Sequence, residues 1–580
     1  MNTKKATGLV ALAVGVALPL SACGGGGNDT KTSTSTGTGS AAAGGATKGG
    51  TIYWLTKRPA EHMDPQRTYI GRDIFNTQRL VYRGLLQFPS GKSGDEANTP
   101  IADVATDAGK SEEGGKKWTF TIKTGVKWED GKDTTCEDFK YGFSRNFATD
   151  VLTGGPSIYP LNYLPSVAKA YKGPYKKTGQ DVYDKAVTCN GATLTFNFEK
   201  PWPDFPLAVA GLNFAAPYRQ DKDQGDKSNY QIFSNGPYKV EGGSWKKGTG
   251  ATFVRNDQYD PKTDGNRQAN PDKVQFIEGL TNEIIAQRLI ADGGNDKYAI
   301  TDRNIPPAFY NQITGKVAER ATNVPSPYTF YLLPNFNKMK NAKVREALAM
   351  STDRAGYVAA IGGEKAATLA KSIINPGVPG YKENPSFTMP DGGDPAAAKK
   401  LLQEAGVTLP YPITYTYQGG TPTSDNAAAA LKAGWDKAGF NTKLAPLTDT
   451  YYDVIQNPSN STFDVTEGGW GADYPSLVTV LTALFDSRIN ITEKSNGQDY
   501  GNYKSADAEK LMDEAASAPD IKAQIAKFQE LDALLGKDVA YIPTYTQKFY
   551  FLHGSGVDQY NQNPATSMFA DLGVIAVKKS

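Results

Sequence analysis

The chain has 580 residues, and its 63 Lys and Arg against 61 Asp and Glu give a formal net charge of +2. This balance argues against a nucleic-acid-binding protein, which needs a clustered excess of basic residues for phosphate. A mean hydropathy of −0.48 argues against a polytopic membrane protein. The only histidines are His62 and His553, too few for a His-rich metal site. At roughly 150 residues per domain, the length predicts three or four domains.

The start of the chain predicts an export signal. Lys4 and Lys5 precede an apolar run over 8–20 that is too short to span a membrane, as in secretory signal peptides. The run ends in Leu20-Ser21-Ala22-Cys23, which resembles a bacterial lipobox, where the Cys is lipidated. We therefore expect residues 1–22 to be a lipoprotein signal peptide. The alternative is an ordinary signal peptide followed by a chance Cys.

Residues 23–49 predict a lipidated Cys23 followed by a flexible linker. This stretch is mostly Gly, Ser, Thr and Ala, which cannot bury enough apolar surface to fold. We expect a protein held by a lipid anchor at the extracytoplasmic face of the bacterial cell membrane and not embedded in it.

The other two cysteines, Cys136 and Cys189, would then face an oxidising compartment. We expect a disulfide between them, because an even pair of cysteines outside the cell normally oxidises. The alternative is two unrelated buried thiols.

The body of the chain has the pattern of mixed α and β structure. Residues 117–123 and 193–199 alternate strictly between apolar and polar side chains, which predicts two half-buried antiparallel strands. Between them, Thr134 and Glu137 are expected to form the capping box of a helix. The aromatic side chains of this helix recur at helical spacing and predict core packing: Phe139, Phe143 and Phe147.

Further helices are predicted in the C-terminal half. Asp394 and Pro395 open a helix that Gly406 ends, and a helix over 425–438 ends at Gly439. Two more amphipathic helices and a strand complete a second α/β unit, at 505–516, 520–535 and 411–417.

Short motifs superficially resemble those of a serine β-lactamase or transpeptidase. They are Ser244-x-x-Lys247, Ser424-Asp425-Asn426 and the Lys-Thr-Gly triplets at 123–125 and 177–179. The order is wrong for these enzymes, because both triplets precede Ser244, and the glycines around Ser244 predict a turn instead of a buried helix. Asp425 is better explained as a helix cap. We expect no enzymatic activity, and a secreted serine hydrolase remains the alternative of another class.

Several segments together resemble the family 5 solute-binding proteins of ABC importers, which include the oligopeptide- and dipeptide-binding proteins. The strongest is Trp118-Thr-Phe-Thr-Ile-Lys-Thr-Gly-Val-Lys-Trp-Glu-Asp-Gly131, followed by Thr135-Cys136-Glu137-Asp138-Phe139. The others come in the family's order: Met63-Asp64-Pro65, Tyr82-Arg83-Gly84-Leu85-Leu86, Ser234-Asn235-Gly236-Pro237-Tyr238-Lys239-Val240, Asn256-Asp257-Gln258-Tyr259-Asp260, Val344-Arg345-Glu346-Ala347-Leu348 with Thr352-Asp353-Arg354, 394–406, and Gly469-Trp470-Gly471-Ala472-Asp473-Tyr474.

The resemblance implies an α/β fold of the periplasmic-binding-protein type II class, with two hinged lobes and an inserted third domain. Carried over, lobe I would comprise 50–87, 215–328 and 548–580. The inserted domain would be 88–214 and lobe II 329–547.

The resemblance also implies a function. The protein would capture extracellular oligopeptides in a cleft between the lobes, close on them by hinge motion, and deliver them to a membrane permease. Its partners would be the peptide, the permease subunits and, indirectly, cytoplasmic ATPases; a monomer with no cofactor, metal or nucleic acid is expected. Since relatives bind nickel complexes, haem or oligosaccharides, a sugar or metal chelate is the alternative ligand.

Asp473 is the residue that the resemblance assigns to the α-ammonium group of a peptide. An enclosed cation needs such a charge-assisted partner; the alternative role is a helix N-cap before 475–484. The stretch 467–471 would pair with the ligand backbone as an added strand. The complete set of expected ligand-binding residues is Asp473, Trp470, Gly471, Gly469, Gly468, Tyr69, Ile70, Tyr328, Tyr451 and Tyr452.

One position departs from the family. Some members have basic residues just before the Trp-x-Ala-Asp segment, where they hold a peptide's C-terminal carboxylate. This chain has Asp464, Thr466 and Glu467 there. The length and C-terminal preference of the ligand are therefore open.

Overall fold

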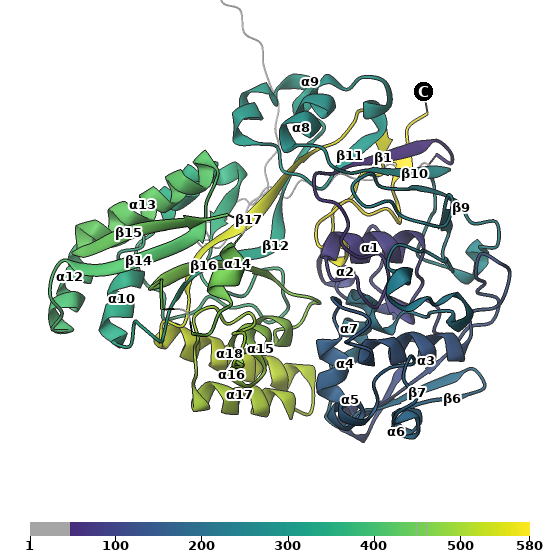
Figure 1. Cartoon of the computed structure of the whole chain (residues 1–580). Coiled ribbons are helices and arrows are strands. Elements are labelled where there is room, and N and C mark those ends of the chain that lie inside the picture. The colour runs from purple at the N-terminus through teal and green to yellow at the C-terminus, as the bar shows by residue number, and fades with distance from the viewer. Residues whose placement is uncertain (1–46, 449, 460, 580) are drawn as a thin grey trace, which may run out of the picture. The chain divides into compact units, whose positions relative to one another are not determined.

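The computed structural model describes residues 47–448, 450–459 and 461–579. The predicted signal peptide, Cys23 and nearly all of the predicted linker therefore lie outside the described residues. Most of the described chain is organised around three larger β-sheets (Figure 1).

The first sheet has five strands in the order β11-β1-β10-β9-β8. Strand β1, the second in this order, runs parallel to both of its neighbours, and Ile52 and Trp54 of β1 are fully buried. We call the part of the chain around this sheet the first lobe. Its elements are β1 (Thr51–Leu55), α1 (Gly71–Leu80), β8 (Tyr238–Val240), β9 (Thr252–Arg255), β10 (Lys273–Ile277), α8 (Asn282–Ala291), β11 (Ala299–Thr301), α9 (Gly315–Ala318), β18 (Val557–Asp558) and β19 (Ala576–Val577).

The second sheet has six strands in the order β13-β17-β12-β16-β14-β15, and we call the part around it the second lobe. Its strands are β12 (Ala321–Pro334), β13 (Ala367–Leu369), β14 (Tyr411–Gln418), β15 (Phe440–Leu447), β16 (Val465–Gly471) and β17 (Ile542–Leu552).

Helices pack on both faces of the six-stranded sheet (Figure 1), because each face presents its own set of buried apolar side chains. One face carries α10 (Ala342–Met350), α11 (Arg354–Ala360), α12 (Pro395–Glu404) and α13 (Pro422–Ala438). The other carries α14 (Tyr451–Ile455), α15 (Val478–Phe485), α16 (Ser487–Asn490), α17 (Ala506–Ala516) and α18 (Ile521–Lys537).

The third sheet has four antiparallel strands in the order β4-β5-β7-β6. Strands β5 and β7 confirm the two strands predicted from alternation, and the apolar side chains of both are buried in one core with Phe139, Phe143 and Phe147. The elements of this part of the chain are β2 (Leu86–Gln87), α2 (Gly94–Ala97), β3 (Ile101–Ala102), β4 (Lys110–Glu112), β5 (Lys117–Thr121), α3 (Cys136–Ser144), α4 (Ile158–Tyr163), α5 (Pro165–Ala170), α6 (Gln180–Ala186), β6 (Val187–Asn190), β7 (Thr193–Asn197) and α7 (Phe205–Gly211).

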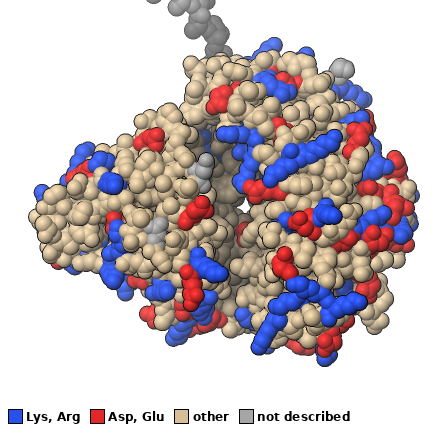
Figure 2. Space-filling view, in the orientation of Figure 1, with Lys and Arg blue, Asp and Glu red and all other residues tan. Residues whose placement is uncertain are grey.

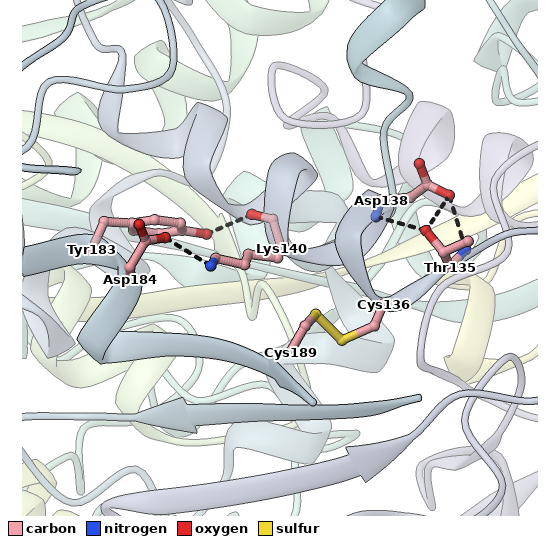
Figure 3. Close-up of a disulfide and its surroundings, with 7 residues drawn as sticks. All are labelled: Thr135, Cys136, Asp138, Lys140, Tyr183, Asp184 and Cys189. Atoms are coloured by element: carbon pink, nitrogen blue, oxygen red, sulfur yellow. Dashed lines mark hydrogen bonds and ion pairs between the residues drawn. A yellow bond between two sulfur atoms is a disulfide. The ribbon is translucent and has the colours of Figure 1, made fainter. Parts of the chain in front are cut away.

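Cys136 and Cys189 form the predicted disulfide, which joins the first residue of α3 to strand β6 (Figure 3). Near it, Lys140 of α3 forms an ion pair of 2.7 Å with Asp184 of α6. The Tyr183 hydroxyl also donates to the carbonyl of Lys140. The disulfide thus fastens α3 to β6, and the two polar contacts fasten it to α6.

Two helix starts differ from the prediction. The capping box of α3 is formed by Thr135 and Asp138, one residue later than predicted, because Thr134 is buried and the strand-like backbone continues through Thr135. Helix α13 begins at Pro422 with Thr421 as its N-cap, so Asp425 lies inside the helix and its predicted capping role is wrong. Its carboxylate instead accepts a hydrogen bond of 2.9 Å from the Tyr417 hydroxyl.

Strands β12 and β17 connect the two lobes. The two are antiparallel neighbours, and their register shifts between Pro325 and Thr329. On one side of this shift, Val324 and Phe549 pack in the core of the first lobe; on the other, Leu332 and Ile542 pack in the core of the second. A pair of crossing strands is therefore the connection about which the lobes can move.

Charged groups of both signs are interspersed over the face of the molecule in Figure 2, as the net charge of +2 leads one to expect. Within the described ranges, no helix is both long and apolar enough to cross a membrane.

Candidate functional site

Strand β16 has one edge that is only partly covered. Along one side it pairs with β12 over its whole length, from Val465 to Gly471. Along the other side, β14 pairs with it only at Val465 and Thr466. The remaining edge, from Glu467 to Gly471, is open to further backbone pairing, and we call it the open edge.

The direction of the backbone groups on the open edge follows from the pairing. The N–H of Asn335, beyond the end of β12, donates to the carbonyl of Asp464 at 2.8 Å, so these two residues form a hydrogen-bonded pair. Because such pairs alternate along an antiparallel ladder, Gly469 and Gly471 direct their N–H and C=O groups away from β12. Glu467 faces the same way, and its carbonyl accepts a hydrogen bond of 2.7 Å from Tyr451.

The glycines of β16 lie under aromatic rings of β12. Tyr331 faces Gly468, Phe330 faces Gly469, and Tyr328 faces Gly471. A Cβ atom at these glycines would come within 2.7 Å, 2.6 Å and 2.9 Å of the respective rings. Only glycine fits beneath these rings, so the open edge carries few side chains that could keep a ligand backbone away.

Two adjoining cavities lie along the open edge and share Gly469. The small cavity has a volume of about 380 Å³, and the large cavity about 800 Å³. The small cavity contains seven of the predicted residues: Tyr69, Ile70, Tyr328, Gly469, Trp470, Gly471 and Asp473. The large cavity contains the remaining three, Gly468, Tyr451 and Tyr452, together with Gly469. All ten predicted residues therefore line one continuous region.

Asp473 lies at the end of the small cavity, in the segment that follows β16. Its carboxylate accepts a hydrogen bond of 2.7 Å from the Tyr69 hydroxyl and a second one from the Tyr159 hydroxyl. No Lys or Arg nitrogen of the described residues forms an ion pair with it, and burial raises its pKa to about 6 against the two hydroxyl bonds, which lower it. The site holds a carboxylate whose charge is met only by neutral donors.

The alternative role of Asp473 as a helix N-cap is wrong. Helix α15 begins at Val478, five residues later, and its N-cap residue is Leu477. The carboxylate is turned instead toward the two tyrosine hydroxyls.

The segment after β16 also joins the second lobe to the part of the chain around the third sheet, on the side of the open edge. Tyr474 is buried in the aromatic core of the third sheet, with its ring centroid 5.5 Å from that of Tyr159. A Cβ atom at Gly211, the last residue of α7, would lie 2.8 Å from the Cβ of Tyr474. The lobes are therefore closed over the small cavity in this structure.

The predicted side chains differ in their exposure and in whether a hydrogen bond holds them in place. Trp470 donates its indole N–H to the carbonyl of Thr479 at 2.7 Å, and Tyr451, 3% exposed, donates to the Glu467 carbonyl. Tyr452 and Tyr69 are 51% and 38% exposed, and Ile70 precedes the first turn of α1. Their contact with a ligand stays a prediction.

Several lining residues were missed from the sequence. Tyr159 comes from α4, more than 300 positions from Asp473, and no local pattern marks it. The large cavity is also lined by aromatic side chains from five separate segments: Tyr310, Phe330, Tyr357, Tyr500, Tyr545 and Tyr550. The chain has 31 Tyr residues, and this count was the available signal, but a count does not give positions.

The hydrolase-like motifs do not form a site. The Ser244 hydroxyl donates to the neighbouring carbonyl of Trp245 at 3.4 Å, whereas Ser424 lies in the first turn of α13 and bonds to Thr421. A nucleophilic serine needs a base within hydrogen-bond reach, and Ser244 has a carbonyl there. Among the described residues, no group of three or more His, Cys, Asp and Glu side chains could hold a metal ion.

Comparison with known proteins gives consistent matches. The family model described as bacterial extracellular solute-binding proteins, family 5 (middle region), matches residues 99–491. The chain is 25% identical over 454 residues to the periplasmic oligopeptide-binding protein OppA of Salmonella typhimurium, covering 74% of this chain and 76% of that protein.

Solved structures share the fold. The clavulanic acid biosynthesis oligopeptide binding protein 2 matches with a TM-score of 0.83 and 24% identity, over 92% of this chain and 96% of that one. DppA of Helicobacter pylori, in complex with the peptide STSA, matches with a TM-score of 0.69 and 18% identity, over 92% and 99% of the two chains. The periplasmic-binding-protein fold with two lobes predicted from the sequence is thereby confirmed.

Proposed function

Because the chain belongs to the family 5 extracellular solute-binding proteins, we propose that it is the substrate-binding lipoprotein of an ABC importer and that its ligand is an oligopeptide. It binds the peptide between the lobes, along the open edge, and catalyses no reaction. The relatives named for oligopeptides and for the peptide STSA support this choice of ligand class.

The observation that supports a peptide most directly is the combination of Asp473 with the open edge. Gly469 and Gly471 offer backbone N–H and C=O groups that an extended chain can pair with. Asp473, beyond the end of this edge, offers a half-buried carboxylate that forms no ion pair with any Lys or Arg of the described residues. A free peptide N-terminus supplies both a backbone that extends along the edge and an ammonium group at its start.

The proposal is tested with protein purified from its native host. Mass spectrometry of the ligand that co-purifies should find peptides, and a mixed peptide library added to protein freed of ligand should raise its Tm. If the co-purifying ligand is a sugar or a metal chelate and the library does not raise the Tm, the protein has the same transport role but its ligand is not a peptide.

Binding should depend on pH in a bell shape. In this closed structure without ligand, burial raises the pKa of the Asp473 carboxyl group to about 6, so below pH 6 binding must first expel its proton and affinity should fall by up to about tenfold per pH unit. Above about pH 8 the peptide amine loses its own proton and affinity should fall again. Titration calorimetry between pH 5 and 9 measures both limbs.

On the acid side, the stability of the unliganded protein should change in the direction opposite to the peptide affinity. A raised carboxyl pKa means that this group's contribution to stability is present below its unfolded pKa and is lost as the pH rises through about 6. When the pH falls from 7 to 5, protonation of Asp473 should therefore raise the free energy of unfolding of the unliganded protein. The same protonation should lower the affinity for the peptide. An affinity that is constant from pH 5 to 7 would contradict the role of this carboxylate.

The lipid anchor, the membrane partners and the domain boundaries complete the proposal. Cys23 attaches the protein to the extracytoplasmic face of the membrane, and the monomer delivers its ligand to permease subunits that cytoplasmic ATPases drive. We propose the boundaries 50–87, 215–328 and 548–580 for lobe I, 88–214 for the inserted domain and 329–547 for lobe II. Replacing Cys23→Ser should move the protein from the membrane fraction to the medium or periplasm; an unchanged membrane fraction would count against lipidation.

A further inference from the structure

Glu467 presents a second carboxylate to the ligand site, in the large cavity at the far end of the open edge from Asp473. It accepts hydrogen bonds from the Tyr415 hydroxyl at 3.0 Å, the Tyr357 hydroxyl at 3.2 Å and the backbone N–H of Gln418 at 2.9 Å. These donors are all neutral, and within the described residues no Lys or Arg nitrogen forms an ion pair with Glu467. Burial raises its pKa, as expected for a carboxylate without a cation.

Aromatic rings surround this carboxylate. Phe330 and Tyr545 stack with ring centroids 4.6 Å apart, and the ring of Tyr357 lies 5.6 Å from that of Tyr545. The faces of such rings attract ammonium and guanidinium groups, and the attraction grows where water is excluded. A carboxylate among aromatic rings is chemically suited to an organic cation.

The other charged groups of the large cavity do not neutralise Glu467. Lys365 lies on an aromatic pair formed by Tyr310 and Tyr550, with its Nζ atom 5.1 Å from the ring centroid of Tyr310 and 5.4 Å from that of Tyr550. Glu283 adds a further negative charge to the lining. The large cavity therefore has an excess of acid.

We propose that Glu467 and the tyrosines around it form a second cation subsite, which selects peptides with a basic side chain. This inference rests on the proposed function and adds the chemical class of peptide. Glu467 lies six residues before Asp473, which corresponds to about 20 Å of extended chain. At about 3.3 Å per residue, a peptide with its N-terminus at Asp473 would bring roughly its fifth to seventh residue to this subsite.

The subsite also gives a role to Glu467 as a position at which this chain departs from the family. A carboxylate at this position repels the C-terminal carboxylate of a short peptide. The ligand must therefore extend past Glu467 or direct a basic side chain to it.

The test uses nonapeptides of alanine with one arginine at position 5, 6 or 7, compared with the same peptides carrying citrulline, a neutral analogue of similar shape. Calorimetry on the wild-type protein should show at least tenfold tighter binding of the arginine peptide at one of these positions. Glu467→Gln should reduce this preference to within twofold and leave the citrulline peptide bound within twofold of wild type. Glu283→Gln, in the same cavity, is the matched control and should preserve the preference.

The outcomes separate the two proposals. Peptides that all bind, but with an arginine preference below threefold at every position, or with a preference that survives Glu467→Gln, overturn the subsite and leave the peptide-binding function standing. Failure of the wild-type protein to bind any of the peptides counts against the peptide function itself and the subsite falls with it. If Glu467→Gln does not fold, the wild-type and Glu283→Gln measurements decide whether the cavity prefers a cation.

Discussion

Replacing Asp473→Asn should weaken the binding of peptides with a free N-terminus by about a hundredfold, because Asp473 carries the only charge among the described residues that line the small cavity. The same peptides with an acetylated N-terminus already lack the cation, so their affinity should change by less than about threefold. Calorimetry with the two forms of one peptide measures the difference directly.

Tyr69→Phe is the matched control for this prediction. It removes one hydroxyl donor to Asp473 but keeps the carboxylate and the aromatic ring, so the preference for a free N-terminus should remain. An equal loss of both peptide forms in Asp473→Asn would reject the ammonium role and indicate that the residue only holds the lobes together through Tyr69 and Tyr159.

A larger side chain at Gly211 should prevent the lobes from closing. In Gly211→Val the new Cβ would lie 2.8 Å from the Cβ of Tyr474, and neither atom is the flexible end of a side chain. The open protein does not make this contact, so the free energy of unfolding should change by no more than about 1 kcal/mol. Peptide affinity should fall by about one to two orders of magnitude, because closure supplies the ligand contacts of the first lobe, opposite the open edge.

Small-angle scattering distinguishes blocked closure from a damaged site. Saturating peptide should contract the wild-type protein, whereas Gly211→Val should keep its radius of gyration. Gly265→Val is a suitable control, because nothing lies within 4 Å of a Cβ at Gly265. A Gly211→Val protein that contracts with full affinity would show that Tyr474 can move aside.

Elements with strong local patterns could be predicted from the sequence. The strict alternation over 117–123 and 193–199 gave β5 and β7 because each buries one face on a single core. The start of α3 was predicted one residue early, since Thr134 with Glu137 and Thr135 with Asp138 fit the same capping pattern. Only the packing of Thr134 in the structure decides between them.

The site could be predicted only where a family motif covers it. Asp473 and the glycines of β16 belong to one short segment, so the motif placed them together. The rings over the glycines depend on the register of β12 against β16, which is a long-range pairing. The donors to Glu467 are Tyr357 of α11 and Tyr415 and Gln418 of β14, and no local rule joins these segments to β16.

The open edge has a consequence for how the protein behaves without ligand. An unpaired strand edge with small side chains is a template on which another chain can add a strand, and this is how β-aggregates begin. Here the first lobe covers the open edge only while the lobes are closed and Tyr474 packs on the third sheet. The open, empty form is then the species most exposed to self-association, and a bound peptide protects the protein by occupying the edge itself.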